Sequence, residues 1–385
     1  MRTFEGYRRP NGTIGVRNHV IVINIVGELA SLTKKLAQLV PGVIPVAHQA
    51  GKAQYPEDLE QTIRTLKGTA GHPNVSAALL LGMGEDDPAE QMVEALRQEG
   101  CFVHSITFQK DKTITDILRE GKLWLEKAVE RSKGQQKEIA DVTELIIGLE
   151  CGGSDAWSGI TANPAIGACS DAIVRDGGTS ILAETTEAIG AEHILANRAV
   201  NPAVGEAFLK IVKEYEERIR DTGEDIRSAN PTPGNMAGGL TTLEEKSLGC
   251  IKKGGNSTLM EVIAYAEKPT EKGFIFMDTP GYDVESVAGL AAGGAQIVLF
   301  STGKGSPTGS PIVPVIKIGT NPRLYEIMSE HIDVNAGKII EGKNTIDEIG
   351  QEIYKLIIDT ANGGLTAAEK HKNQEFAIWR LAQTK

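Results

Sequence analysis

The first third of the chain alternates short apolar runs with amphipathic segments. Val20–Ile25 is β-branched and strand-like, and Glu28–Leu39 follows it with apolar residues at helical spacing. Parallel strands need long crossover connections, which helices usually supply, so this alternation predicts a parallel sheet covered by helices. We therefore expect an N-terminal α/β domain of the Rossmann or flavodoxin-like type. The scheme recurs in three further strand and helix pairs: 43–47 with 56–66, 77–81 with 87–97, and 102–107 with 113–130.

A second, larger α/β domain is expected after a polar linker at Arg131–Glu138. At 385 residues the chain is too long for one typical core, which favours two domains, 1–135 and 140–385. Many of the 43 glycines fall in the long loops Ser228–Thr242 and Ser301–Pro314, and long loops in a compact protein are usually functional or disordered. The sequence thus predicts an active site built from loops of the second domain. Its expected strands are 145–149, 180–183, 273–277 and 297–300, and its expected helices are 164–175, 202–220, 345–361 and 367–381.

Composition excludes several classes of partner. The net charge of −11 argues against nucleic acid, which requires clustered Lys and Arg. The longest apolar runs, such as Val20–Val26, are far too short to span a membrane. The N-terminal ten residues have no apolar core, so they are not a secretory signal. The four cysteines are scattered without a CxxC pair, which is typical of reduced thiols. We expect a cytoplasmic protein that binds neither nucleic acid nor membrane.

The segment Cys151–Gly167 combines backbone freedom with polar side chains. It follows a predicted strand and precedes a predicted helix, where glycines let the backbone approach a ligand and helix N-termini stabilise anions. Cys151 and Asp155 are plausible ligands for a divalent metal. An equally weighted alternative is a glycine-rich turn in which Asp155 caps the helix. Ser154, Thr161 and Asn163 are candidate substrate contacts in this segment.

A second set of candidate residues follows the predicted strand 180–183. Glu184 and Glu187 lie at the strand end, and His193 follows one or two helical turns later. Carboxylates and a histidine in this arrangement suit a metal or an acid–base pair. Alternatively, acidic residues favour the first turn of a helix because of its macrodipole, and this explanation suits Glu187 better than Glu184.

Two later loops and one earlier loop supply further candidates. Asn235 and Thr241 lie in a polar, glycine-rich loop, although Thr241 and its neighbours could simply form a capping box. The segment 301–310 lacks the GxxxxGK[ST] order of a nucleotide site, but Lys304 and Lys317 could hold a substrate carboxylate if they are not surface lysines. At the end of the second predicted strand, where α/β sheets bind ligands, His48 could act as a base and Lys52 as an anion contact.

Together these motifs resemble the altronate/galactarate dehydratase family along nearly the whole chain. The resemblance is carried, in fixed order, by the segments 6–19, 151–167, 184–187, 230–246, 277–285 and 301–317. It implies a lyase that removes a proton and a 3-substituent from a 2,3-dihydroxy acid and releases a 2-keto-3-deoxy acid. Iron(II) or manganese(II) is the implied cofactor, because the developing enediolate needs a cationic clamp.

The resemblance also assigns expected roles to individual residues. The implied metal ligands are Cys151, Asp155, Glu184, Glu187 and His193. The expected catalytic residues are His48, Glu184, His193 and Lys317. The expected substrate contacts are Lys52, Ser154, Thr161, Asn163, Asn235, Thr241 and Lys304.

Two departures from the family pattern bear on substrate and partner. Sugar-acid members commonly carry cysteines in the first domain, where this chain has His48–Gln54 instead. They also often carry a small N-terminal domain, so a separate small subunit is a possible partner, and a homo-oligomer is expected. The large subunit of (2R)-sulfolactate sulfo-lyase, a relative that expels sulfite, also lacks those cysteines and is similar near 328–334 and 360–363. A sugar acid is the favoured substrate, and sulfolactate is the alternative.

A non-catalytic or NAD-binding α/β protein is the rival class. A dinucleotide fold should show G-x-G-x-x-G after its first strand, and Ile23–Ala30 does not. A pure binding protein would not need carboxylates, a cysteine and a histidine at successive strand ends. The sequence therefore favours an enzyme.

Overall fold

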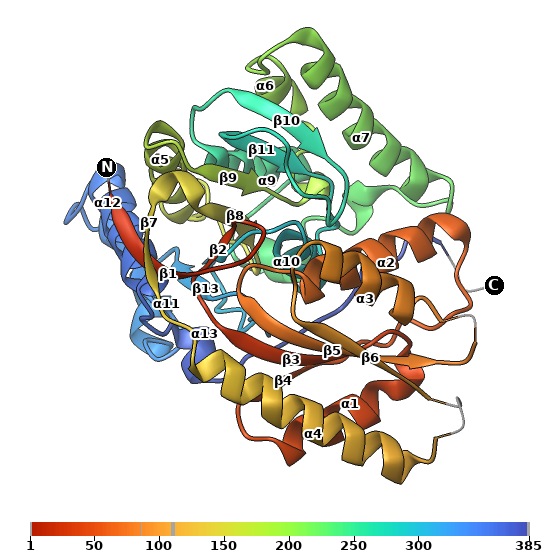
Figure 1. Cartoon of the computed structure of the whole chain (residues 1–385). Helices are drawn as coiled ribbons and strands as arrows, with labels where there is room; N and C mark the ends of the chain where they lie inside the picture. Colours follow the sequence, from red (N-terminus) through yellow and green to blue (C-terminus); the bar gives the residue numbers. More distant parts are fainter. Residues whose placement is uncertain (1, 86, 109–111, 383–385) are drawn as a thin grey trace.

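The computed structural model describes residues 2–85, 87–108 and 112–382. In these ranges the strands form two parallel sheets, each flanked by helices, and one small antiparallel sheet that joins them (Figure 1). The chain is therefore an α/β protein, as the sequence predicts. No helix in these ranges is long and apolar enough to cross a membrane.

The first sheet has four parallel strands in the order β4–β3–β5–β6. In chain order this is 2-1-3-4, the beginning of the flavodoxin-like arrangement. Helices α1 and α4 contact one another and cover one face, and α2 and α3 contact the sheet from the other side (Figure 1). The strands are β3 (His19–Asn24), β4 (Val43–Val46), β5 (Val75–Met83) and β6 (Val103–Phe108), and the helices are α1 (Ala30–Leu39), α2 (Pro56–Ala70), α3 (Ala89–Gln98) and α4 (Ile114–Lys133).

The second sheet has seven parallel strands in the order β10–β11–β9–β8–β12–β13–β14. Helices α5 (Ala162–Arg175) and α12 (Ile346–Ala361) pack together on one side, and α10 (Asp283–Ala292) lies on the other side against α2. The strands are β8 (Ile146–Cys151), β9 (Thr179–Leu182), β10 (Leu259–Ile263), β11 (Phe274–Met277), β12 (Ile297–Thr302), β13 (Val315–Gly319) and β14 (Val334–Asn335). The remaining helices are α6 (Glu192–Ala196), α7 (Pro202–Arg220), α8 (Pro233–Ala237), α9 (Leu243–Cys250), α11 (Pro322–Ile327) and α13 (Ala367–Lys370).

The N-terminal strand connects the two units. Strand β1 (Thr3–Arg8) pairs antiparallel with β2 (Ile14–Gly15) and with β7 (Glu138–Asp141), which opens the second unit. The predicted linker is thus the last turn of α4 plus the entry to β7. Since β1 belongs to the connecting sheet, the first residues of the chain contribute to the junction between the units.

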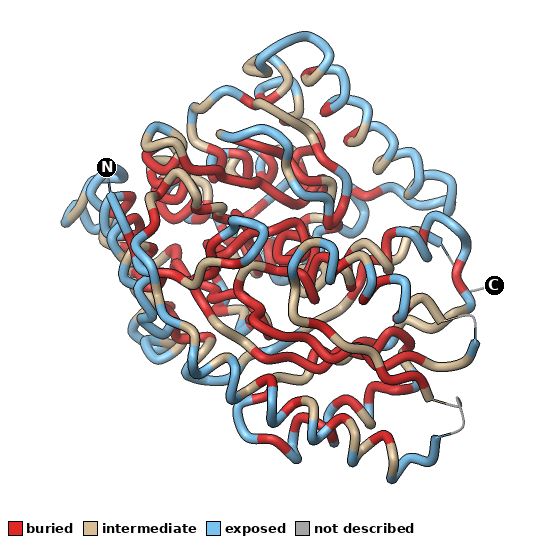
Figure 2. The backbone as a smooth tube through the Cα atoms, viewed as in Figure 1, coloured by how far each residue is buried: buried red, intermediate tan, exposed pale blue. Residues whose placement is uncertain are grey.

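The buried core is continuous between the units. Along β12, Ile297 and Leu299 face the α5 side, whereas Val298 and Phe300 face the first unit and join the same cluster as Ile21 and Leu80. This alternation is the period of two that a strand imposes. Figure 2 shows the buried segments running through both sheets, with exposure concentrated on the outer helices. A sheet buried on both faces explains why its strands are apolar almost throughout.

One predicted helix is wrong, and six of the described strands were missed: β1, β2, β7, β10, β13 and β14. Residues 367–381 do not form one helix, because α13 ends at Lys370 and the chain then runs extended along α2. There Asp58 accepts a hydrogen bond from Leu381 N, and Gln61 donates one to Trp379 O, so α2 satisfies backbone groups that a helix would have paired internally. Strand β13 was missed because its central Lys317 breaks the apolar run.

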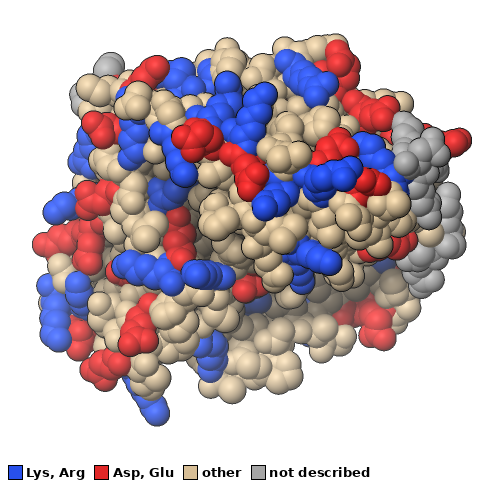
Figure 3. All heavy atoms as spheres, turned by 60° about the horizontal axis from the view of Figure 1, so that its bottom comes forward, with Lys and Arg blue, Asp and Glu red and all other residues tan. Residues whose placement is uncertain are grey.

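On the face that Figure 3 presents, lysine and arginine side chains lie interspersed with aspartate and glutamate side chains. This mixing suits the modest net charge of −11. Ion pairs between neighbouring helix residues also occur on α7, where Lys210 pairs with Glu214 and Lys213 with Glu217.

Candidate functional site

The candidate site lies at the carboxyl ends of three adjacent strands. Strands β9, β8 and β12 are neighbours in the second sheet, and all three are parallel. Their carboxyl ends therefore lie at one edge, where β8 delivers Cys151 and β9 delivers Glu184. This edge is where open α/β sheets place their ligands.

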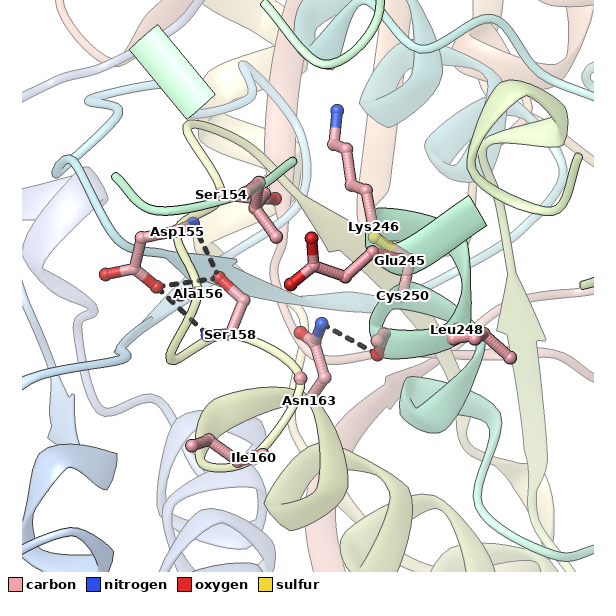
Figure 4. A pocket seen from close by; sticks show the side chains of 13 residues that line it. Ser154, Asp155, Ala156, Ser158, Ile160, Asn163, Glu245, Lys246, Leu248 and Cys250 are labelled. Carbon is pink, nitrogen blue, oxygen red and sulfur yellow. Dashed lines mark hydrogen bonds between the residues drawn. The ribbon is translucent and has the colours of Figure 1, made fainter. Parts of the chain in front are cut away.

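A cavity of about 220 Å³ opens beside the Cys151 segment. Its walls are the loop after β8, the start of α5, and helix α9 (Figure 4). Figure 4 shows the side chain of Glu245 pointing from α9 toward Ser158. The cavity brings together two regions that are almost a hundred residues apart in the sequence. Its polar lining residues include Ser154, Asp155, Ser158, Asn163, Lys246 and Cys250.

Six ionisable side chains lie buried at and behind the α9 wall of this cavity, and we call them the buried ionisable cluster. The sulfurs of Cys151 and Cys250 are 3.6 Å apart, and Cys250 Sγ lies 3.4 Å from a carboxylate oxygen of Glu187. Lys246 Nζ donates to the other oxygen of Glu187 at 2.8 Å. Because Lys246 and Cys250 line the cavity, a ligand there would meet the outer part of the cluster directly. The members are Cys151, Glu184, Glu187, Lys246, Cys250 and Lys253.

The pKa values of the two thiols are shifted in opposite directions. A hydrogen bond from Cys250 and the nearby ammonium of Lys253 hold the pKa of Cys151 well below its ordinary value. The same hydrogen bond, together with burial, raises the pKa of Cys250. The two sulfurs therefore titrate as a pair in which Cys151 loses its proton before Cys250 does.

Lys253 and Glu184 form a fully buried ion pair. Lys253 Nζ lies 3.1 Å from Glu184 Oε2, and both side chains are at most 1% exposed. Burial alone would lower the pKa of Lys253, but the negative charges of Cys151 and Glu184 raise it well above its ordinary value. Burial raises the pKa of Glu184, with the charges of Cys151 and Glu150 adding to the effect. A buried charge is tolerated only when it is paired, and here each cation has an anion beside it.

Glu184 is held in an uncommon backbone conformation. Its φ of 71° and ψ of 76° lie in the left-handed region, where a residue other than glycine costs on the order of 1 kcal/mol or more. Thr279 fixes this turn, because its hydroxyl accepts a hydrogen bond from Glu184 N at 2.7 Å. The conformation lets a Glu184 carboxylate oxygen accept from Cys151 N at 2.8 Å. The strained turn therefore joins the ends of β8 and β9.

Several predicted site residues have structural roles in the same region. Asp155 accepts hydrogen bonds from Ser158 N, Thr320 and Asn321, so it holds the turn before α5, whereas the N-cap position of that helix is Thr161. Asn235 completes the capping box of α8 by accepting from Thr232, the N-cap, and it donates to Ser154 O, while Thr241 donates to the carboxylate of Glu245 at the start of α9. Thr161 donates to Trp157 O and Thr320 O, and Asn163 donates to Gly249 O. Ser154, Asp155 and Asn163 line the cavity all the same.

Other predicted residues lie apart from the buried ionisable cluster. His193 is exposed on α6, and Lys304 is exposed after β12. His48 is buried in the first unit with both ring nitrogens bonded to backbone groups, Nε2 to Asn24 O and Nδ1 to Ala50 N. Burial lowers its pKa to about 4. Lys52 donates to Met83 O across the same edge of the first sheet. The roles predicted for these residues stay predictions.

Sequence reasoning missed half of the buried ionisable cluster. Lys246, Cys250 and Lys253 are spaced by four and three residues, so they share one face of α9 and the short helix after it. The signal in the sequence was that Lys246 and Lys253 occupy helix positions that usually carry buried apolar residues.

Comparison with known proteins identifies the family. A model of the D-galactarate/altronate dehydratase C-terminal region matches residues 142–384, and a model of the second domain of D-galactarate dehydratase/altronate hydrolase matches residues 6–133. The chain belongs to the D-galactarate/altronate dehydratase family. It is therefore a lyase, as the sequence predicts.

Three relatives illustrate the range of the family. Altronate dehydratase of Bacillus subtilis (strain 168) is 37% identical over all of this chain and 78% of its own length. The (2R)-sulfolactate sulfo-lyase subunit beta of Chromohalobacter salexigens is also 37% identical, over all of this chain and 98% of its own length. Galactarate dehydratase (L-threo-forming) of Escherichia coli (strain K12) is 35% identical over 94% of this chain and 73% of its own length.

A second pair of buried ionisable side chains, those of Glu150 and Lys317, lies on the second sheet next to the Cys151 segment. Glu150, Phe300 and Lys317 are register neighbours on β8, β12 and β13, so their side chains share one face. Lys317 Nζ lies 3.5 Å from the centre of the Phe300 ring. In the described structure neither Lys317 Nζ nor Glu150 Oε1 has a hydrogen-bond partner. Burial lowers the pKa of Lys317 to about 7, although the charge of Asp283 opposes the shift.

We expect Lys317→Met to stabilise the protein most at or below pH 7. The pKa of Lys317 is about 7 in the folded state and ordinary, 10.5, in the unfolded state, so the unfolded chain binds more protons between these values. The wild type therefore gains stability from this group as pH rises through that window, on the order of 1 kcal/mol per pH unit at most. The variant lacks this gain. Urea unfolding at pH 6.5 and pH 9 measures the free energy of unfolding of both proteins. If the excess stability of the variant does not shrink at pH 9, the lowered pKa of Lys317 is contradicted.

Proposed function

We propose that this chain catalyses β-elimination from a small 2,3-dihydroxy acid, with a sugar acid of the altronate or galactarate type as substrate. The observation that supports it most is the buried ionisable cluster, which places paired cations and anions at the wall of a cavity at the carboxyl edge of a parallel sheet. Elimination next to a carboxylate needs positive charge for the enediolate and a group that accepts the proton. The cluster contains both.

The proposed division of roles follows from position. Lys246 lines the cavity and can bind the substrate carboxylate, while Lys253 adds positive charge behind it. Of the two carboxylates in the buried ionisable cluster, Glu187 is the one that contacts the cavity-lining Lys246 and Cys250, and it is proposed to accept the proton at C2. Glu184 and its strained turn hold the Cys151 loop in place.

A divalent metal is part of the proposal. The sulfurs of Cys151 and Cys250, 3.6 Å apart, have the separation of two ligands on one tetrahedral ion, and sulfur donors favour iron(II) over manganese(II). Among the side chains described, no three of His, Cys, Asp or Glu gather as ligands, so substrate oxygens would complete the site. A bound metal would supply Lewis-acid stabilisation of the enediolate. The cytoplasmic location and the homo-oligomer stay predictions.

Sulfolactate is the second candidate substrate. The sulfo-lyase subunit beta is as similar to this chain as altronate dehydratase is, 37% in both cases. Loss of sulfite instead of hydroxide uses the same proton abstraction at C2. Because that relative is named a subunit, we also propose that this chain can act with a separate small partner.

The test of this proposal measures product. The protein is loaded with iron(II) or manganese(II) under anaerobic conditions, with and without a small partner subunit of the family. We expect a 2-keto-3-deoxy acid from altronate or galactarate; sulfite from sulfolactate would select the second candidate. Neither product, despite bound metal and partner, would refute both substrates.

A further inference from the structure

A second cavity of about 290 Å³ lies at the junction of the two units, and we call it the arginine pocket. It is lined by the end of β1 and the turn after it, by the turns that precede β5 and β6, and by the end of α4. This is the amino edge of the first parallel sheet, opposite to the edge that carries His48. The charged residues of its lining are Arg8, Arg9, Glu99, Arg131 and Glu138, together with the polar Ser76.

Arg9 is a buried cation without a carboxylate. Its guanidinium donates to Pro73 O, Asn18 Oδ1, Gln135 Oε1 and Arg17 O, all of which are uncharged. Within the described ranges no Asp or Glu lies within ion-pair distance of it. Burial lowers the pKa of Arg9 to about 10, which still leaves it charged at neutral pH. An unpaired charge that is only 8% exposed is costly, and a bound anion would remove that cost.

Both glutamates of the lining already have cationic partners other than Arg9 and Arg131. Glu138 lies 3.6 Å from Arg8, which also pairs with Glu144. Glu99 lies 2.8 Å from Lys67 and within 3.9 Å of Lys268. These pairs leave the positive charge of Arg9 uncompensated.

Arg131 and Ser76 supply two further groups of the arginine pocket that can bind an anion. The guanidinium of Arg131 stacks on the ring of Phe102 at 4.6 Å, and no acidic partner lies within ion-pair distance in the part of the chain that is described. The hydroxyl of Ser76 is buried and makes no hydrogen bond there, although it lines the cavity. A planar cation held on an aromatic ring and an unpaired hydroxyl are the groups that bind oxyanions.

We propose that the arginine pocket binds a small oxyanion carrying two negative charges, a phosphate group or a dicarboxylate, between Arg9, Arg131 and Ser76. Such a ligand would bridge Arg9, which directly follows strand β1, to Arg131 at the end of α4, and β1 pairs with β7 at the start of the second unit. It would thereby stabilise the junction between the units. The site is separate from the Cys151 cavity and does not depend on the proposed lyase function.

The test uses inorganic phosphate and succinate as probes of the whole chain, by calorimetry at constant ionic strength. We expect saturable binding of at least one probe, weakened about tenfold or more in Arg131→Met because a charge-assisted contact is lost. Arg119→Met is the matched control, since Arg119 lies on the same helix with 69% of its side chain exposed. Ser76→Ala gives a second variant that leaves the charges unchanged, and it should weaken binding by a smaller factor.

The two probes separate the sources of the oxyanion. Tighter phosphate binding indicates a phosphate ester, and tighter succinate binding indicates a dicarboxylate. Absence of saturable binding by either probe would overturn the proposal. Equal affinity in Arg131→Met and Arg119→Met would also overturn it, because the binding would then be non-specific.

Discussion

Replacement of Cys151 by alanine is expected to lower the elimination rate about a hundredfold or more while the fold is kept. The variant removes the sulfur that contacts Cys250 at 3.6 Å behind the cavity wall and whose pKa is lowered by that contact and by the charge of Lys253. The variant thereby removes a sulfur that contacts the cavity-lining Cys250 and one of the two sulfurs proposed to hold the metal. The measurement is the initial rate of keto-acid formation by metal-loaded protein, together with the metal content and the melting temperature.

Cys169→Ala provides the control for this variant. Cys169 is buried on α5 among apolar side chains, and burial raises its pKa, so it is an uncharged packing residue. The control should lose about 1 kcal/mol of stability and keep its rate. A Cys151→Ala protein with full rate and full metal content would remove Cys151 from the site.

Replacement of Lys253 by methionine is expected to destabilise the protein by about 3–5 kcal/mol. The ammonium of Lys253 is fully buried and lies 3.1 Å from Glu184, so the variant leaves a carboxylate in the interior without its cation. Removing both charges, in the double variant Lys253→Met with Glu184→Gln, should recover much of the loss. Urea unfolding at one fixed pH gives the free energies for this double-mutant cycle.

Lys210→Met is the matched control for the lysine variant. Lys210 lies on α7 with 72% of its side chain exposed, next to Glu214, and an exposed pair of this kind contributes about 0.5 kcal/mol or less. If Lys253→Met unfolds within 1 kcal/mol of the wild type, the ion pair with Glu184 is not present in solution.

Much of the fold followed from periodicity. The four strand–helix units of the first sheet were predicted because each strand is an apolar run of ordinary length followed by an amphipathic helix. Helix α7 was predicted with its observed bounds, and in the structure Asn201 caps it and Pro202 occupies its first turn. The strand β1 was not predicted, because its partner β7 is more than a hundred residues away and the pairing leaves no local signal.

The candidate site was only half predictable for a similar reason. Cys151 and Glu184 were found because strand ends of a parallel sheet collect ligand-binding groups. Their partners Lys246, Cys250 and Lys253 come from a helix that reaches the same place only after folding. Asp155 was ambiguous because the side chain that could bind a metal is also the one that caps a turn, and in the structure its oxygens bond Ser158, Thr320 and Asn321.

The most direct test of the central claim is the isotope content of the product formed in D2O. Elimination removes the proton at C2, and the resulting enol takes up a solvent deuteron at C3 when it becomes the keto acid. We therefore expect one deuterium at C3 of the keto acid from altronate or galactarate, or one in the methyl group of pyruvate from sulfolactate. A keto acid without deuterium at C3 would contradict elimination through an enol, and with it the function proposed for the Cys151 cavity.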